Sequence, residues 1–464
     1  GAFWAVALGV VPVSALPPSV SCVVNSTADA AAFAPATGCD STLGAGKVTL
    51  RSAIDHFNGA AISETVAFNL PAGSVIRLTL GELHVVSSTG TLKIAGPGAR
   101  ALAVDGNAAD RVFHLGRALR GTVTAVISGI TVRNGHTTNL STFPAYAGGG
   151  FFNDQANLTL DQVVVTGNVA SFGAGIDQEG VLTLTNSTLS GNSVTMSVGS
   201  VDGCGGAAME VKTEGLRVTT TLSNVTVTGN TEGPPCSGGT FAIAGKTAFT
   251  NVTIAGNIGA DGAISGAGVS LAISDSIVAG QSGSANCVSA PTDGGNNLDS
   301  GTSCAFTALK HDQFSTDPLL VPLANNGGST DTMALGATSP AIDGVLAAAC
   351  PQPAADQRGL TRPQGASCDI GAFEFSPLKV TTVSASCGVP AGGGLVTIDG
   401  SGLLGATQVR FGSTPALSFT VVSDTRIDAV APSGPSGQPV DITVTTPAGT
   451  SITSAGDLCS HQAA

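Results

Sequence analysis

The feature that most constrains this chain is a short strand-like motif that recurs along its middle. Each copy alternates small or polar residues with Val, Ile or Leu and ends in Gly-Asn, or in Gly-Gln in the last copy. Successive copies lie 24, 38, 27 and 24 residues apart, measured between their glycines. Short strands at such a period are typical of solenoid proteins. The copies are DQVVVTGN (161–168), TNSTLSGN (185–192), SNVTVTGN (223–230), TNVTIAGN (250–257) and SDSIVAGQ (274–281).

Glycine-rich segments between the copies supply a second and a third short strand in each unit. Two or three strands per unit at this period predict a right-handed parallel β-helix, in which each coil buries Val, Ile and Leu against the next. The asparagine that ends each copy then falls at one corner of successive coils, where its amide can bond the coil above and below. The same repeat accounts for the N-x-S/T matches at Asn157, Asn186, Asn224 and Asn251, which we interpret as structural rather than as glycosylation sites.

The flanking segments have a different character. In residues 46–60, apolar side chains at Leu50, Ala53, Ile54 and Phe57 follow helical spacing, so we expect an amphipathic helix that covers the first coil. From about residue 378 to 459 the sequence reads as seven strands at hairpin spacing, which indicates an immunoglobulin-like sandwich.

Charge and hydropathy limit the partners. The net charge is −13 with a pI near 4.7, and no run of Lys or Arg exists to neutralise phosphates, so we expect no nucleic-acid partner. The apolar start of the chain is typical of a secretory signal, and we assign residues 1–15 to a partial signal peptide with cleavage after Ala15. No later stretch is long and apolar enough to span a membrane.

Ten cysteines fit an oxidising, extracellular compartment. None has the CxxC spacing of a metal or redox motif, so structural disulfides are favoured over zinc or redox chemistry, although spacing alone does not establish the pairing. As sequence neighbours they fall into five pairs, which are Cys22 with Cys39, Cys204 with Cys236, Cys287 with Cys304, Cys350 with Cys368, and Cys387 with Cys459.

Three segments resemble known families. VTLRSAIDHFNGA (48–60) is similar to the CSLREA motif of bacterial secreted β-helix proteins, with Val48 in place of its Cys and Ser52 in place of its Glu. Residues 317–344 with DQRGLTRPQGASCDIGAFEF (356–375) resemble the choice-of-anchor Q region, and the last 80 or so residues resemble an IPT/TIG domain.

These resemblances imply three parts: a signal (1–15), a β-helix (16–376) with a closing region (317–376), and an IPT/TIG domain (377–464). They also imply an exported or cell-surface bacterial protein. In this interpretation the charged residues of 356–375 end the β-helix and are structural rather than catalytic. Arg358 and Arg362 would pair with carboxylates of the same segment. A disulfide between Cys350 and Cys368 would clamp that turn.

Parallel β-helices also include polysaccharide lyases and hydrolases, so we searched for converging acids. Asp177 and Glu179 would point the same way from one strand, and Asp154 occupies the comparable part of the preceding coil. A glycosidase needs two such carboxylates, and a lyase commonly adds calcium and a basic residue. Glu210, Lys212 and Glu214 in the next unit would extend this acidic patch, and a solvated face or turn is the competing interpretation.

Histidines and aromatic residues gave little further support for an active site. His56, His84, His114 and His136 look isolated, so we predict no metal site and no cofactor, with calcium possible only for a lyase. The only Trp is Trp4. A sugar would therefore have to stack on Phe or Tyr, and our ligand-binding candidates are Tyr146, Phe151 and Phe152, although Phe in a β-helix commonly lies in the interior.

We therefore predict an all-β exported protein that works as an extracellular or cell-surface adhesion or binding scaffold and contacts glycans or other surfaces. A polysaccharide lyase or glycoside hydrolase that uses Asp154, Asp177 and Glu179 is the first alternative. A purely structural envelope or matrix protein without a specific ligand is the second.

Overall fold

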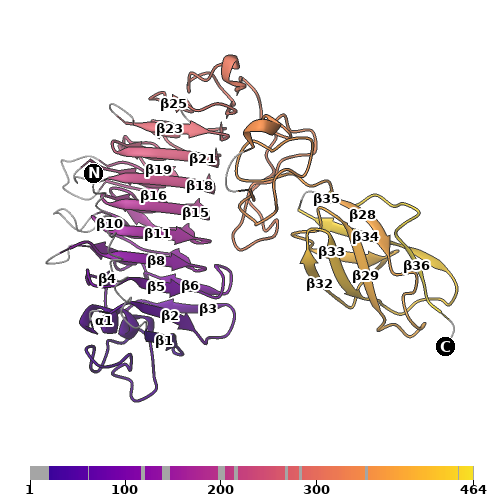
Figure 1. The fold of residues 1–464 in the computed structure, drawn as a ribbon, viewed down its shortest axis with the longest axis horizontal. Coiled ribbons are helices and arrows are strands. Elements are labelled where there is room, and N and C mark those ends of the chain that lie inside the picture. Colours follow the sequence, from indigo (N-terminus) through magenta and orange to yellow (C-terminus); the bar gives the residue numbers. More distant parts are fainter. Residues whose placement is uncertain are drawn as a thin grey trace, which may run out of the picture.

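The computed structural model describes residues 20–60, 62–116, 121–137, 147–196, 204–213, 218–266, 270–281, 285–350, 354–447 and 449–462. The segment expected to be a signal lies outside them. The described residues form a stack of parallel coils, a loop-rich segment beside the stack and an antiparallel sandwich (Figure 1). The predicted fold class, a parallel β-helix followed by an immunoglobulin-like sandwich, is confirmed.

Three parallel faces run along the stack. The first face contains β1 (Val20–Val24), β2 (Glu64–Phe68), β5 (Leu92–Ala95), β8 (Thr124–Ser128), β11 (Asn157–Asp161), β23 (Leu271–Ser274), β25 (Thr292–Asp293) and the first halves of β15 (Val181–Ser190), β18 (Thr219–Thr228) and β21 (Lys246–Ala255). The second face contains β3 (Ser74–Arg77), β6 (Leu102–Asp105), β9 (Thr131–Arg133), β12 (Val164–Thr166), the second halves of β15, β18 and β21, β24 (Ile277–Ala279), β26 (Leu298–Asp299) and β27 (Gln313–Phe314).

The third face is a seven-stranded sheet. It contains β4 (Leu83–Val85), β7 (Phe113–Gly116), β10 (Phe151–Asp154), β14 (Ile176–Gln178), β17 (Met209–Val211), β20 (Phe241–Ile243) and β22 (Ile264–Ser265). A small sheet at one corner contains β13 (Val169–Ala170), β16 (Ser193–Val194) and β19 (Thr231–Glu232).

The interior of the stack is built from side chains that repeat at one register position in successive coils. Along one column of the first face, each side chain is at most 1% exposed, and burying one such side chain contributes about 1.5–3 kcal/mol. Alternation along each strand sends these residues inward and their neighbours outward. This column of the first face consists of Val66, Ile94, Ile127, Leu160, Leu184, Leu222, Phe249 and Ile273.

The asparagines that end the repeats form the predicted ladder. The amide nitrogen of Asn168 donates to the side-chain oxygen of Asn192, and the same bond links Asn192 to Asn230 and Asn230 to Asn257, each at 2.9 Å. All four side chains are buried. The glycine before each asparagine has a positive φ, as at Gly191 (61°), which explains why the motif keeps glycine at this corner.

Helix α1 (Leu50–Ala60) covers the first coil, as expected, and contacts β1, β2 and β4. Its apolar side buries Leu50, Ile54 and Phe57. Thr49 and Ser52 cap the helix start reciprocally, because each backbone N–H donates to the other's hydroxyl, at 2.9 and 3.0 Å. Ser52 thus does what a glutamate does at this position of a capping box.

The closing region (317–376) was expected at the end of the stack but lies along its second face (Figure 1). The Thr188 hydroxyl donates to the Asp331 carbonyl at 2.6 Å, and the Asn224 amide to the Ala355 carbonyl at 2.9 Å. The Arg100 guanidinium, far earlier in the chain, pairs with Asp331 at 2.6 Å. Polar groups on several coils thus hold the segment. It includes the short helix η2 (Ala347–Ala349) and follows the short helix η1 (Ala308–Lys310).

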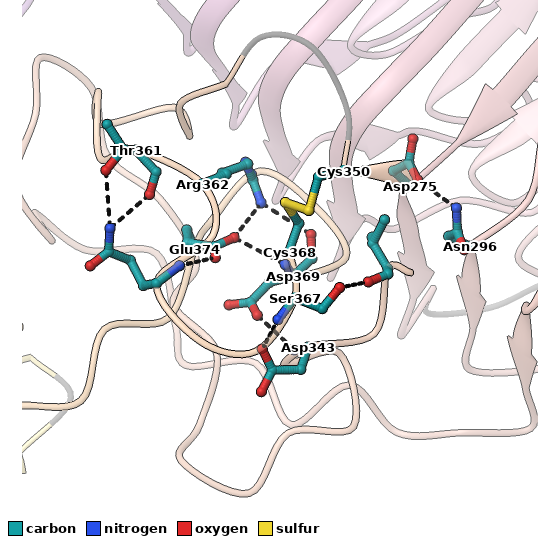
Figure 2. Close-up of a disulfide and its surroundings, with 12 residues drawn as sticks. Asp275, Asn296, Asp343, Cys350, Thr361, Arg362, Ser367, Cys368, Asp369 and Glu374 are labelled. Carbon is teal, nitrogen blue, oxygen red and sulfur yellow. Dashed lines mark hydrogen bonds and ion pairs between the residues drawn. A yellow bond between two sulfur atoms is a disulfide. The ribbon is translucent and has the colours of Figure 1, made fainter. Parts of the chain in front are cut away.

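Charged residues inside the closing region neutralise one another (Figure 2). The guanidinium of Arg362 lies 2.8 Å from the carboxylate of Glu374, with both side chains fully buried, and Arg358 pairs with Asp356 at 2.7 Å. Burial, and then the charge of Glu374, raises the pKa of Asp369 to about 7. The ion pairs expected for Arg358 and Arg362 are therefore present.

The C-terminal sandwich has two antiparallel sheets around its own apolar core. One sheet contains β28 (Lys379–Val383), β29 (Leu395–Ser401), β33 (Arg426–Val430) and β32 (Ser418–Ser423), and the other contains β31 (Thr414–Pro415), β30 (Gln408–Phe411), β34 (Pro439–Thr446), β35 (Gly449–Thr450) and β36 (Leu458–Ser460). Within the described residues, no helix has the length and apolar character needed to cross a membrane.

Five disulfides staple the chain, and they are the five pairs expected from sequence order. Their Cα atoms lie 4.9–6.0 Å apart, within the usual range for a disulfide. The bonds join Cys22 to Cys39, Cys204 to Cys236, Cys287 to Cys304, Cys350 to Cys368, and Cys387 to Cys459. The structural role predicted for all ten cysteines is therefore confirmed.

Two of these disulfides hold the chain beyond the last Gly-Asn coil. Cys304 is fully buried, and its backbone N–H donates to the Asp299 carboxylate at 3.0 Å, so the bond to Cys287 fixes a loop against β26. Cys368 is also fully buried, and its bond to Cys350 closes the turn next to Arg362 and Glu374 (Figure 2). The clamp that the resemblance implied for this turn is thus present.

Candidate functional site

The predicted acidic residues gather on the outer side of the third face. Because side chains alternate along a strand, the middle residue of each short strand points away from the apolar interior. In register, these residues form a row across five coils, and the row is His84, His114, Phe152, Asp177 and Glu210.

A second row lies two residues further along the same strands. Asn153 pairs with Gln178, and Gln178 with Val211, so Asp154, Glu179 and Lys212 follow one another in adjacent coils. Asp154 therefore lies opposite Glu179 in the next coil. The corner after Asp154 holds one residue more than the corner of the next coil, since Asn153 pairs with Gln178 but Asn157 pairs with Val181.

Lys212 joins the acids of the two rows. Its ammonium nitrogen lies 2.8 Å from Asp177 Oδ2 and 3.4 Å from Glu179 Oε1. Burial, and then the charge of Asp177, raises the pKa of Glu179 to about 7. Burial disfavours a charged Lys212, but Asp177, Glu210 and Glu179 outweigh it and raise the pKa of the lysine above its ordinary value. The three predicted carboxylates therefore converge, with a basic residue among them. Glu214 lies outside the described residues.

Four further residues lie next to the acidic residues, on the side of the earlier coils, and were not expected to be close together. They are Glu82, His84, Arg111 and His114. His84 and His114, expected to be isolated, stack with ring centroids 4.1 Å apart. His114 Nδ1 lies 2.9 Å from Glu82 Oε1, and Arg111 Nε lies 2.7 Å from Glu82 Oε2. His114 Nε2 is 3.6 Å from Asp154 Oδ2, so the histidines connect to the acidic residues.

The electrostatics of these histidines differ. Burial, and then the neighbouring His114, lowers the pKa of His84. Burial acts in the same direction on His114, but the carboxylates of Asp154 and Glu82 outweigh it and raise its pKa. The pKa of Glu82 is lowered, because its bond to His114 and the charge of Arg111 exceed the effect of its burial.

The aromatic candidates are placed differently from one another. Phe151 points into the interior and stacks on Phe113, with ring centroids 5.2 Å apart, so it cannot touch a ligand outside the stack. Phe152 points outward beneath Arg111, whose guanidinium carbon is 5.0 Å from the ring centre, and is fully buried. Tyr146 lies outside the described residues.

A calcium ion fits this acidic group poorly. The oxygen atoms that would bind it, on Asp177 and Glu179, already face the ammonium group of Lys212. A divalent cation there would have to displace that charge. The arrangement can instead hold and move protons, because a carboxyl of pKa about 7 adjoins a permanent cation and a second carboxylate.

One part of the chain is similar to a known family. Residues 378–459 match the IPT/TIG domain. This range is the antiparallel sandwich of β28 to β36, so the expected C-terminal IPT/TIG domain is confirmed. IPT/TIG domains generally serve in surface or extracellular binding and scaffolding, and five disulfides are compatible with that setting. A comparison with curated proteins found no match to the chain.

Proposed function

We propose that this chain is an exported, extracellular or cell-surface binding scaffold of bacterial origin that contacts glycans or other surfaces. The observation that carries the proposal is an IPT/TIG domain joined to a disulfide-stapled β-helix. Such a stack keeps its outer side chains in fixed positions, which lowers the entropy lost when an extended ligand binds. Resemblance to the CSLREA and choice-of-anchor Q regions supports the same setting.

A recess at one corner of the stack suits contact with a ligand. It has a volume of about 440 Å³ and is lined by Glu232, Pro234, Pro235 and Ile258, among others. The disulfide of Cys236 fixes its loop to the neighbouring coil. Both prolines are exposed and Ile258 is 51% exposed, so an apolar floor faces solvent next to a carboxylate.

Binding to immobilised polysaccharides tests this function. The protein would be passed over a panel of acidic and neutral polysaccharides, with and without calcium, and retention measured by biolayer interferometry. We expect retention on at least one of them and an approximately tenfold weaker affinity for Ile258→Ser. Ile452→Ser, at an 81% exposed position of the IPT/TIG domain, is the matched control. Retention on none of the panel would contradict the proposal and favour a purely structural protein.

A polysaccharide lyase or glycoside hydrolase is the second candidate. The specific observation in its favour is the convergence of Asp154, Asp177 and Glu179 with Lys212. A carboxyl of pKa about 7 suits a general acid, and an adjacent carboxylate suits a base or nucleophile. Against it, Asp177 is fully buried and Glu179 is 3% exposed, so a polysaccharide would have to displace whatever covers them.

Product analysis separates the two candidates. New reducing ends indicate a hydrolase, and unsaturated uronates indicate a lyase. Turnover that disappears in Asp177→Ala, and persists in the exposed control Asp40→Ala, would make the acidic rows an active site and overturn the scaffold proposal. Retention of a polysaccharide without products would reject the enzyme.

A further inference from the structure

The proposed functions give no role to the stacked side chains of His84 and His114. The chain has only six histidines, yet two of them meet face to face on adjacent coils, with planes 11° apart. Stacking alone does not require imidazoles, since Ala242 and Ser265 occupy the same register position in later coils. Placing two imidazoles and a glutamate here carries a desolvation cost that small residues would avoid.

We propose that Glu82, His84 and His114 form a binding site for a divalent transition-metal ion, with zinc as the first choice. Each residue offers a ligand atom, and these atoms lie within 4.8 Å of one another. Two imidazoles and one carboxylate are a ligand set that zinc, copper and nickel accept, whereas calcium and magnesium prefer oxygen alone.

A buried nitrogen of His84 points to a ligand. Within the described part of the chain, His84 Nε2 is buried and makes no hydrogen bond, whereas His114 Nε2 lies 3.6 Å from the Asp154 carboxylate. His114 itself is 7% exposed. A buried imidazole nitrogen without a hydrogen bond is uncommon, because its desolvation is uncompensated. A metal ion bound by His84 Nε2 would satisfy that nitrogen, and Glu82 and the Nδ1 atom of His114, 2.9 Å apart, are next to each other.

Small rotations complete the geometry. A zinc ion with bonds near 2.0–2.1 Å brings its ligand atoms to roughly 3.3 Å from each other in a tetrahedron. Parallel rings 4.1 Å apart must tilt towards a common point to reach that spacing, and rotation about the last side-chain bond of each histidine provides the tilt. The parallel register of β4 and β7 already places the two rings on adjacent coils.

The surroundings supply the remaining parts of such a site. Asp154 Oδ2, at 3.6 Å from His114 Nε2, can orient that imidazole while its other ring nitrogen binds the metal. Arg111, which is 2.7 Å from Glu82 Oε2, can keep that carboxylate oriented after the other oxygen binds metal. The two carboxylates also balance the charge of the ion.

The other group of potential ligands, at the first coil, lacks this character. Cys22 and Cys39 are joined in a disulfide, so their sulfurs are not thiolates. Of the four residues of that group, only His56 and Glu64 keep a ligand atom. That group retains one imidazole and one carboxylate, whereas the Glu82, His84 and His114 group retains all its ligands.

Titration of the chelator-treated full chain with zinc alone tests the site. We expect one ion per chain by calorimetry, a rise in melting temperature on adding zinc, and the visible absorption of a tetrahedral complex with cobalt. His84→Phe and His114→Phe preserve an aromatic stack, since Phe152 is the next residue in the row, and each should weaken zinc binding at least 100-fold. Glu82→Gln should weaken it about tenfold.

A matched control uses the exposed His311, which has a φ of +62°. His311→Asn tolerates that backbone conformation and should leave zinc binding unchanged. The proposal is overturned if the wild-type chain takes up no zinc, or if His84→Phe and His114→Phe both bind zinc as the wild type does. Because the melting shift is measured on the wild-type chain, the test survives even if a variant fails to fold.

Discussion

Removing the Arg362 guanidinium should strongly destabilise the closing region. Its Nη1 lies 2.8 Å from Glu374 Oε2, and it also donates to the carbonyls of Asp369 at 3.0 Å and Gly371 at 2.7 Å. In Arg362→Met, the fully buried carboxylate of Glu374 loses its cationic partner and retains the backbone N–H groups of Gln364 and Asp369. Two carbonyls lose the donor that Arg362 supplies. Breaking a buried ion pair from one side costs about 3–5 kcal/mol, and we expect that loss in the free energy of unfolding near pH 8.

The loss should shrink in acid, and this dependence is the sharper test. Burial raises the pKa of Glu374, an effect that Arg362 opposes. Without the arginine the folded-state pKa rises further, so folded Arg362→Met holds a proton that the unfolded chain releases above its ordinary pKa of 4.5. Stability of the variant therefore falls as pH rises through that window, and below it most of the loss disappears.

Urea denaturation followed by circular dichroism at pH 5 and pH 8 measures both effects, and limited trypsin digestion locates the region that opens. Arg426→Met is the control, because its ion pair with Asp428 is 47% and 29% exposed and should contribute less than about 1 kcal/mol. A loss below 1 kcal/mol for Arg362→Met, or one that does not change with pH, would refute the reasoning.

Three further changes test other parts of the fold. Glu179 has a pKa of about 7, so this group alone should lower the free energy of unfolding by about 3 kcal/mol between pH 4.5 and 7, and Glu179→Gln should remove that contribution in chemical denaturation. Asn230→Ala removes the ladder bonds to Asn192 and Asn257 and should lower the free energy of unfolding by about 2–4 kcal/mol in chemical denaturation. The exposed control Asn157→Ala should lower it by less than about 0.5 kcal/mol. Replacing Cys387 and Cys459 by Ala opens a loop of 72 residues, which should cost the sandwich about 4 kcal/mol in calorimetry while the stack melts unchanged.

The coils and their ladder could be predicted because their causes are local. A glycine at positive φ followed by an inward asparagine recurs at each corner, so the sequence repeats where the backbone repeats. Disulfide pairs were predictable for a related reason, since four of the five join cysteines no more than 32 residues apart. Apolar side chains at helical spacing likewise predicted helix α1.

The cluster of charged residues and histidines on the third face could not be predicted, because it depends on the register between adjacent coils. The repeated motif does not fix that register. Asn153 and Gln178 are 25 residues apart, whereas Asp161 and Thr185 are 24 apart. The spacing between coils thus changes by one residue within a single turn, and an error of one residue in register sends a side chain to the opposite side of its strand. His84 and His114 lie in the earlier coils, where no repeated motif relates their positions, so the sequence showed two separate imidazoles.

The packing of the closing region along the second face of the stack also could not be predicted from the sequence. The contacts that hold it join residues more than 100 positions apart, as between Asn224 and Ala355, and they use backbone carbonyls and single hydroxyls. No hydrophobic period marks such a surface. Local charge pairing within 356–375 was predictable, because those residues are close in the chain.

The sideways attachment of the closing region also sets how the molecule bears mechanical load. A pull on the C-terminal domain enters the stack through bonds at Arg100, Thr188, Asn224 and Thr253, which lie at different heights along it. These bonds share the force in shear, so several must yield together. If the segment only extended the last coil, the same pull would peel the coils one after another from that end. The stack is therefore braced against a force applied through the C-terminal domain.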